Sequence, residues 1–287
     1  MQAGGLPQSA IAQWLGQMQL VAFFPHDLVL VAGEPGERRR FLNLELGKTR
    51  PAHFADAARY RRVLQQRNAL LRHLAESRFA GRSPLGPAAE GLGTLAQWNK
   101  QVITYGARIL AQRAQFLAEL KPLLLEVHRR LSGLETPLTA EYSPGVKGAA
   151  NLAAEDGAAR WSRLLASSLE ADHETDMRRG TTQSGPHRDD IVFKLGGMDL
   201  RRYGSQGQQR LGVLSLKIAL ARWVQQTTGE PPILLLDDAL SELDATRRSQ
   251  LLDEAAAFPQ SVLTATDAGF IGDQASAVLR VQAGKVV

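Results

Sequence analysis

The sequence predicts an α/β protein in which a mixed sheet with flanking helices carries an inserted α-helical lobe. Residues 232–237 form a short apolar run without polar alternation, which indicates a strand buried on both faces, as in a parallel sheet. Residues 54–74 and 95–131 have the apolar periodicity of long helices and predict the inserted lobe. A chain of 287 residues is long enough to bury the core that such a fold needs.

The composition narrows the class of protein. The chain has no cysteine, which excludes disulfides and thiolate metal sites and fits a cytoplasmic location. It shows no secretory signal and no apolar run long enough to cross a bilayer, so we expect no membrane partner.

Charge is distributed unevenly along the chain. Residues 1–131 carry 18 Lys and Arg against 9 Asp and Glu, whereas residues 132–287 carry 16 against 20. An Arg-rich first half joined to an acidic second half suggests a polyanion-binding surface attached to a catalytic module. Because 27 of the 34 basic residues are Arg, the bias of a GC-rich genome also fits, and composition leaves both interpretations open.

The first elements are expected before residue 80. Residues 19–31 indicate a strand, a turn at Pro25 and a short amphipathic segment, which the Gly- and Pro-containing residues 33–36 interrupt. Glu37 begins the next predicted helix. The segment 54–74 then places apolar residues at helical spacing, with arginines between them.

The helical lobe is completed by residues 95–131. Val102, Ile109, Phe116 and Leu123 recur every seven residues and form one apolar stripe. Residues 81–93 are rich in Pro and Gly and indicate a turn, so we expect the two long helices to form an antiparallel pair. The stripe has almost no polar groups, which argues against a cofactor site between the helices.

The remaining elements are predicted from shorter signals. In chain order we expect a strand at 136–142, a loop at 143–148, a helix at 150–170, a turn at 185–190, a strand at 191–195, a helix at 208–227, the strand at 232–237, a helix beginning at Asp244, a strand at 261–266 and a closing strand or hairpin at 277–287.

Two motifs near the C-terminus point to phosphate and metal chemistry. The apolar strand ends in Asp237 and Asp238 and is followed by Ser241-Glu-Leu-Asp244. Upstream, Tyr203-Gly-Ser205-Gln-Gly207-Gln-Gln-Arg210 opens a predicted helix. A first carboxylate can bind Mg²⁺ and a second can orient a water toward a γ-phosphate, while backbone amides at a helix N-terminus favour a phosphate.

A loop that grips phosphates is not found in the chain. Such a loop reads G-x-x-x-x-G-K-[ST]. The only Gly-Lys-Thr is Gly47-Lys48-Thr49, but Leu42 stands where the first glycine belongs, and residues 41–46 are typical of a helix. We therefore expect that the sequence is a fragment of a longer protein, the alternative being a homologue that has lost the loop.

Together these motifs resemble the second half of an ABC-type ATPase head, and more specifically the RecF family of SMC/ABC-type ATPases. The resemblance covers the chain from about residue 18 to its end. It is carried by the strand and signature motifs above and by the following segments: Gly185-Pro-His-Arg-Asp-Asp190, Phe23-Phe-Pro-His-Asp27-Leu, Glu37-Arg-Arg-Arg-Phe-Leu42, Tyr60-Arg-Arg-Val-Leu-Gln-Gln-Arg67-Asn68-Ala-Leu-Leu71 and Trp98-Asn-Lys-Gln101.

The resemblance implies a nucleotide site for Mg²⁺ and ATP. Asp237 would be the metal-binding Walker B carboxylate, with Asp238 in the place of the water-orienting acid. Ser205 and Gly207 would contact the γ-phosphate held by the opposite protomer, supported by Gln206 and Arg210, with Asp244 on the dimer seam. Each position also has a bland interpretation, namely a strand end or a helix cap.

Arg188, Thr264 and Thr266 are further candidates. Arg188 faces the nucleotide in the family and could contact phosphate or adenine, but Asp189 and Asp190 could equally hold its loop through local salt bridges. Thr264 and Thr266 end the strand where transporters carry a switch histidine. Thr264 could sense the γ-phosphate or simply complete a turn.

For nucleic acid, arginines are the candidate phosphate contacts. The predicted set is Arg38, Arg39, Arg40, Arg61, Arg62 and Arg67, with Arg59 and Arg72 as further members. Their alternative role is on solvated helix faces, and the adjacent Arg61 and Arg62 cannot both point inward. Aromatic residues are sparse among them, which favours duplex over stacked single-stranded DNA, although single-stranded DNA stays possible.

The resemblance implies a mediator of DNA repair, replication and recombination. ATP would close a homodimer around duplex DNA near a single-strand gap, and a full-length form would hydrolyse the ATP slowly. The protein would act in SOS or gap repair and in recombinase loading, together with RecR- and RecO-like partners. Residues 1–48 would be the remnant of the first head lobe, 49–175 the helical lobe and 176–287 the C-terminal head. A nucleotide-independent DNA-binding or interaction module is the alternative, and a transporter ATPase is disfavoured because Leu-Ser-Gly-Gly-Gln is absent.

Overall fold

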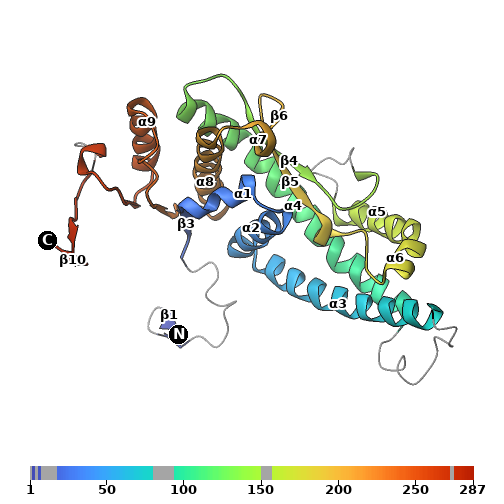
Figure 1. Cartoon of the computed structure of the whole chain (residues 1–287). Helices are drawn as coiled ribbons and strands as arrows, with labels where there is room; N and C mark the ends of the chain where they lie inside the picture. Colours follow the sequence, from blue (N-terminus) through green and yellow to red (C-terminus); the bar gives the residue numbers. More distant parts are fainter. Residues whose placement is uncertain (1, 4–5, 8–17, 80–93, 150–156, 272–274) are drawn as a thin grey trace. The chain divides into compact units, whose positions relative to one another are not determined.

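The computed structural model describes residues 2–3, 6–7, 18–79, 94–149, 157–271 and 275–287 (Figure 1). The chain forms two compact units. We call Met1–Met18, Gly33–Pro122 and Thr139–Lys194 the helical unit, and Gln19–Ala32, Leu123–Leu138 and Leu195–Val287 the sheet unit. None of the described helices is both long and apolar enough to cross a membrane.

The helical unit is built on long helices that the periodicity predicted. Its main elements are α2 (Pro35–Thr49), α3 (Pro51–Phe79) and the part of α4 (Leu95–Ser132) up to residue 122. His53 of α3 contacts Gln112 of α4, whereas Arg67, further along α3, contacts Asn99, nearer the start of α4. The partners run in opposite directions, which confirms the antiparallel pair. Residues 81–93, predicted to be the turn, fall outside the described residues.

The predicted apolar stripe of α4 is buried. Val102 and Phe116 are 0% exposed and Ile109 is 1% exposed. Within the helical unit, Val102 and Ile109 of this stripe pack with Tyr60 of α3 and Trp161 of α5 (Ala158–Ala171) in one hydrophobic cluster. A helix with a continuous apolar stripe is stable only when a partner covers that stripe. The packing of α4 against α3 in this cluster therefore stabilises both of these long helices.

The helical unit also contains shorter elements, among them α6 (His173–Arg179) and the 3₁₀ turn η5 (Pro186–Arg188). β4 (Leu138–Ser143) and β5 (Asp190–Leu195) are neighbouring strands of its sheet, and the short β6 (Met198–Asp199) belongs to the sheet unit. The expected strands at 136–142 and 191–195 are thereby confirmed. The expected helix at 150–170 begins at Ala158 in the described part, and residues 150–156 fall outside it.

The sheet unit is organised by three parallel strands in the order β3-β7-β8. They are β3 (Leu20–Phe23), β7 (Ile233–Leu236) and β8 (Ser261–Leu263). β7 is central, with Leu20 opposite Ile233 and Leu236 opposite Leu263. Leu234 and Leu236 are buried while Ile233 and Leu235 are half-buried, so the predicted parallel strand is confirmed with one face covered more fully than the other.

Helices complete the sheet unit. The 23-residue α8 (Gln206–Thr228) packs against β3 and α1 (Val29–Ala32), and α9 (Ala245–Ala256) begins after Asp244, as predicted. Its smaller elements are η2 (Pro25–Leu28), α7 (Leu200–Tyr203), η6 (Ala268–Phe270) and a hairpin of β9 (Val281–Gln282) with β10 (Lys285–Val286). The N-terminal pair β1 (Gln2–Ala3) with β2 (Leu6–Pro7) belongs to the helical unit.

The two compact units divide the chain differently from the three sequential domains that we predicted. Residues 19–32 belong to the sheet unit because β3 pairs with β7, more than 200 residues later. Residues 139–194 belong to the helical unit, to which Asp176 and Asp189 are joined by ion pairs from α3 and α4. Long-range strand pairing and ion pairing, which composition does not reveal, set these boundaries.

Candidate functional site

The carboxyl ends of the parallel strands bring the acidic motif and Thr264 together. The Asp237 amide donates to the Phe23 carbonyl at 3.0 Å, and the Thr264 amide donates to the Leu236 carbonyl at 3.0 Å. Both residues thus continue the strand ladder by one step. The Thr264 hydroxyl donates to Asp237 Oδ1 at 2.6 Å, and among the described residues no donor reaches the second oxygen of that carboxylate.

Asp238 has an unusual backbone conformation. Its φ is +49°, in the left-handed region that non-glycine residues rarely adopt. Its amide donates to the Thr264 hydroxyl at 3.0 Å, and its Oδ2 accepts from the Ser241 hydroxyl at 3.1 Å. Such strain costs of order 1–3 kcal/mol and persists where neighbours over-determine it. The side chains of Thr264 and Ser241 therefore fix how the two carboxylates are presented.

Arg210 holds the loop after Asp238 from the first turns of α8. It is 4% exposed, its guanidinium donates to the Asp238 carbonyl, and it forms an ion pair of 3.1 Å with Glu242. The guanidinium also lies 5.8 Å from the centre of the Phe23 ring. Arg210 Nε is buried without a partner among the described residues. The sequence predicted Arg210 as a support of the nucleotide surface, and here it fixes the loop that carries Asp238.

The signature motif forms the N-terminus of α8. Ser205 is the N-cap, and its hydroxyl accepts from the Gln208 amide at 3.3 Å, while Gln208 Oε1 accepts from the Ser205 amide at 2.9 Å. This reciprocal capping box is the bland role that the sequence left open. Gln206 and Gly207 are exposed, and a Cβ on Gly207 would meet nothing within 4 Å. The positive end of a 23-residue helix is therefore open to an anion.

Asp244 and Lys48 have local partners. Asp244 is the exposed N-cap of α9, and its Oδ1 accepts from the Arg247 amide at 2.9 Å. Lys48 lies in the last turn of α2 and pairs with Glu45 at 2.8 Å. Gly47-Lys48-Thr49 is thus part of a helix, which confirms that it is no phosphate loop.

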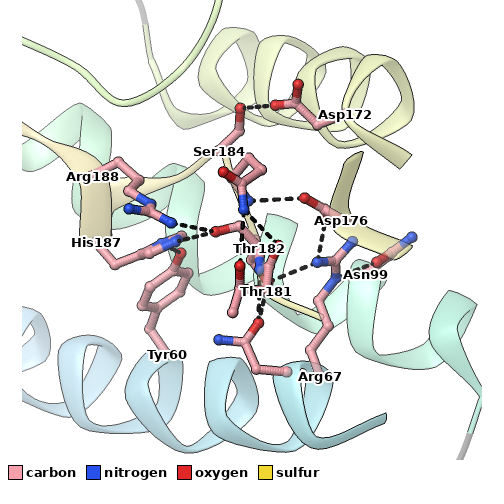
Figure 2. A network of polar contacts seen from close by, with 12 residues as sticks. Tyr60, Arg67, Asn99, Asp172, Asp176, Thr181, Thr182, Ser184, His187 and Arg188 are labelled. Atoms are coloured by element: carbon pink, nitrogen blue, oxygen red, sulfur yellow. Dashed lines mark hydrogen bonds and ion pairs between the residues drawn. The ribbon is translucent and has the colours of Figure 1, made fainter. Parts of the chain in front are cut away.

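The turn around Arg188 is held by long-range contacts in the helical unit. His187 lies between the Tyr60 hydroxyl, 2.8 Å from its Nδ1, and the Thr182 carbonyl, 3.0 Å from its Nε2 (Figure 2). Burial lowers the pKa of His187 to about 4, so the ring is neutral at pH 7. Arg188 is exposed and donates to the Thr182 carbonyl at 3.4 Å.

The acidic residues of this turn do not form the local salt bridges that the sequence suggested. Asp189 is buried and pairs with Arg113 of α4 at 2.5 Å, while Asp190 pairs with Arg38 of α2 at 2.6 Å. Arg113 was not predicted as a site residue. Its spacing, four residues after Ile109 and three before Phe116, places an arginine on the apolar stripe of α4 and is the signal that could have found it.

Two of the predicted DNA contacts are internal, and we remove them from the set. Arg67 is 0% exposed and donates to Asn99, Asp176 and Thr182 (Figure 2). Arg38 is 3% exposed and paired with Asp190. Side chains buried and bonded in this way have no donors to offer to a DNA phosphate.

The other six arginines of the set also lie in the helical unit, and Arg59 and Arg72 among them are exposed. Arg40, Arg61 and Arg62 are exposed, and Arg40 has a weak 3.7 Å contact with Glu37. Arg39 is half-buried and donates to the Asp189 carbonyl at 2.9 Å. The exposed arginines and the sheet-edge carboxylates belong to different units of the chain.

Comparisons with known proteins place the chain in a family. No protein-family model matches it. It is 37% identical over 281 residues to the DNA replication and repair protein RecF of Desulfitobacterium hafniense, covering 98% of this chain and 72% of the relative. It is 40% identical over 281 residues to the protein of the same name from Chloroflexus aurantiacus, covering 95% and 68%.

Solved structures agree with these relatives. A structure of the recombination mediator protein RecF-ATPrS in the RecFOR pathway superposes with a TM-score of 0.78 at 26% identity, over 98% of this chain and 71% of that chain. One of RecF-ATP in the same pathway gives 0.77 at 28% identity, over 92% and 66%. The predicted ATPase-head fold is thereby confirmed, and the chain belongs to the RecF family of DNA replication and repair proteins.

Proposed function

We propose that this RecF-like recombination mediator binds Mg²⁺-ATP at the edge of its parallel sheet and uses the nucleotide to hold DNA. ATP would close a homodimer around duplex DNA beside a single-strand gap, and slow hydrolysis would release it. The observation that carries the proposal is the arrangement of Asp237, Asp238 and Thr264 at the carboxyl end of the central strand β7.

The donor set fits a hard divalent cation. Asp237 keeps one carboxylate oxygen without a donor from the described residues, and the Thr264 hydroxyl holds the other at 2.6 Å. Carboxylate and hydroxyl oxygens are ligands that Mg²⁺ prefers, directly or through water. When bound, Mg²⁺ would neutralise phosphate charge. Asp237 would hold the cation, Asp238 would orient a water, and Thr264 would couple the two through its hydrogen bonds.

The N-terminus of α8 supplies the second half of the proposed site. Ser205, Gln206 and Gly207 are exposed there and would bind the γ-phosphate held by the partner protomer. Arg210 would keep the Asp238 loop in place, and Asp244 would lie on the seam between protomers. Arg188, exposed in the helical unit, stays a candidate phosphate or adenine contact.

Arg39, Arg40, Arg61 and Arg62 are the proposed DNA contacts. Their charge favours a phosphate backbone, and binding through them should weaken steeply with salt. RecR- and RecO-like proteins are the proposed protein partners, because the solved relatives belong to the RecFOR pathway.

The test measures affinity for gapped duplex DNA by fluorescence anisotropy, with and without Mg²⁺-ATP, in the native polypeptide expressed from its own gene. We expect ATP to tighten binding and Asp237→Asn to abolish that gain while leaving the ATP-free affinity unchanged. Glu230→Gln, which neutralises an exposed carboxylate in the sheet unit, is the matched control. Equal affinities with and without ATP in the unsubstituted protein would instead indicate a nucleotide-independent DNA-binding module.

A further inference from the structure

A cavity of about 160 Å³ lies within the helical unit, where α2, α3 and α4 meet the turn η5. Its polar lining consists of Arg39 and Asn43 from α2, Tyr60 and Arg61 from α3, Arg113 from α4 and His187. A single water needs roughly 10–15 Å³ on this measure, so the cavity has room for a larger polar group. Arg61, one of the lining residues, is exposed to solvent.

The charges around this cavity do not balance. Asp189 neutralises Arg113, and Asp190 neutralises Arg38. Arg39 reaches only a carbonyl, that of Asp189, and no carboxylate in the described part of the chain pairs with Arg61. Burial, and next to it Arg113, lower the pKa of Arg39, and these effects outweigh the nearby Asp189 and Asp190, which raise it. The cavity is therefore positive by about two guanidinium groups.

The hydrogen-bonding groups around the cavity are mostly donors. Arg113 is 3% exposed and is fixed by the Pro186 carbonyl at 2.7 Å and by Asn43 Oδ1 at 2.8 Å. Its Nε is buried and has no acceptor among the described residues. Because Asn43 Oδ1 accepts from Arg113 and contacts His53, the free group of Asn43 is its Nδ2 amide, which donates. A buried donor without an acceptor is destabilising, and Arg113 is thus a buried cation with a donor that the protein leaves unsatisfied.

The wall opposite these donors is rigid and neutral. The Tyr60 hydroxyl donates to His187 Nδ1, so Nε2 carries the proton that His187 donates to the Thr182 carbonyl. Gly185, at φ +136°, allows this packing, since a Cβ there would come within 2.5 Å of the Tyr60 hydroxyl. Tyr60, His187 and Arg113 are thus held in place around a pocket that is lined mostly by donors.

We propose that this pocket binds a single phosphate group, held by Arg39, Arg61 and Asn43 against the fixed guanidinium of Arg113. The phosphate could belong to a nucleic-acid backbone or be a free phosphate ion, because both present the same tetrahedral oxyanion. The backbone source rests on the proposed DNA binding, whereas the free-ion source does not.

The experiment compares two charge-matched double variants of the whole chain. Arg39→Gln with Arg61→Gln removes two cavity-lining arginines, and Arg40→Gln with Arg62→Gln removes their exposed sequence neighbours, which do not line the cavity. Arg61→Gln alone is the reserve variant, because this exposed side chain has no hydrogen bond or ion pair to lose in the described part of the chain. Urea unfolding in chloride first establishes that each variant folds.

The free-ion arm measures how far inorganic phosphate raises the urea midpoint above chloride at equal ionic strength. Phosphate stabilises proteins nonspecifically, and the Arg40/Arg62 variant measures that background. We expect the Arg39/Arg61 variant to lose the part of the rise that exceeds this background in the unsubstituted chain.

The backbone arm measures affinity for a short DNA duplex as a function of salt. We expect the Arg39/Arg61 variant to bind roughly tenfold more weakly than the Arg40/Arg62 variant. The slope of log affinity against log salt should become less steep by about 0.9, the value for one phosphate contact.

A selective loss in the backbone arm identifies DNA as the source, and a selective loss confined to the free-ion arm identifies free phosphate. If the two variants behave alike in both arms, the pocket is not a phosphate site. Should the unsubstituted chain not bind DNA, the proposed function fails while the free-ion arm still decides the pocket.

Discussion

Arg67 is expected to stabilise the helical unit and not to contact DNA, and replacing it with methionine separates these roles. Its side chain and that of Asp176 are both 0% exposed and lie 2.8 Å apart. Arg67 also donates to Asn99 at 2.7 Å and to the Thr182 hydroxyl at 2.7 Å (Figure 2). Methionine keeps most of the apolar stem but removes all of these donors.

The expected loss follows from what remains after the substitution. Asp176 would keep the Gln183 amide at 2.9 Å as a donor but would lose its only counter-charge in the described structure. Breaking a buried ion pair by removing one partner costs about 3–5 kcal/mol. With a urea slope of about 3 kcal/mol per molar, a loss of about 4 kcal/mol lowers the unfolding midpoint by about 1.3 M.

The assay is urea unfolding followed by circular dichroism, with Arg67→Met, Asp176→Asn and the double variant. Because removing both charges leaves no unpaired ion, we expect the double variant to recover at least about 2 kcal/mol relative to the sum of the single losses. If a single variant loses less than about 1 kcal/mol of unfolding free energy, which is the range for an exposed ion pair, the buried-pair reasoning is refuted. The DNA affinity of the folded Arg67→Met fraction should be unchanged, and a specific loss there would return Arg67 to the DNA-binding set.

Three further predictions concern single side chains. The pKa of His187 is lowered to about 4, below its ordinary value of 6.5, so the unfolded chain takes the proton first as pH falls. The stability that the neutral ring contributes is complete above pH 6.5 and is lost between pH 6.5 and about 4, by about 1.4 kcal/mol per pH unit. His187→Gln should therefore flatten the pH dependence of the urea midpoint. His173→Gln, on an exposed side chain, should leave that dependence unchanged. Asp238→Gly relieves a φ of +49°, so the urea midpoint should stay equal or rise. The same substitution should remove the proposed ATP dependence of DNA binding. A lower urea midpoint would contradict the strain argument. Ser205→Ala removes the α8 cap and should lower the free energy of unfolding in urea by about 0.5–2 kcal/mol. Ser205→Asp should keep the cap and abolish the ATP-dependent gain in DNA affinity. If Ser205→Asp retains that gain, the role of Ser205 is limited to capping.

Much of the fold could be predicted because its signals are local. The seven-residue spacing of Val102, Ile109 and Phe116 already specifies a buried helix face, and the structure buries it. The run ending at Asp237 specifies a parallel strand, and Asp244 is the N-cap that its position before a helix predicts. In each case the residue type and its near neighbours decide the conformation.

What could not be predicted depends on contacts far apart in the sequence. Arg61 and Arg67 lie on the same helix with similar neighbours, yet Arg61 is exposed and Arg67 is 0% exposed. The difference comes from Asp176, which is 109 residues away. Likewise, the sequence suggested local salt bridges for Asp189, whereas its partner is Arg113. Helical periodicity identifies a face, but the charge that meets this face is set by tertiary structure.

The division of the arginines bears on why the helical unit would bind a polyanion. Arg38, Arg67 and Arg113 are each neutralised by a carboxylate between residues 176 and 190 of the same unit. These pairs make no net contribution to the surface potential, since each buried cation has its own anion. Arg39 and Arg61 meet no such carboxylate in the described residues, and both line the donor-rich cavity. Two arginines without a carboxylate partner among the described residues therefore lie together at the proposed phosphate pocket, and a genome that merely favours arginine codons gives no reason for this placement.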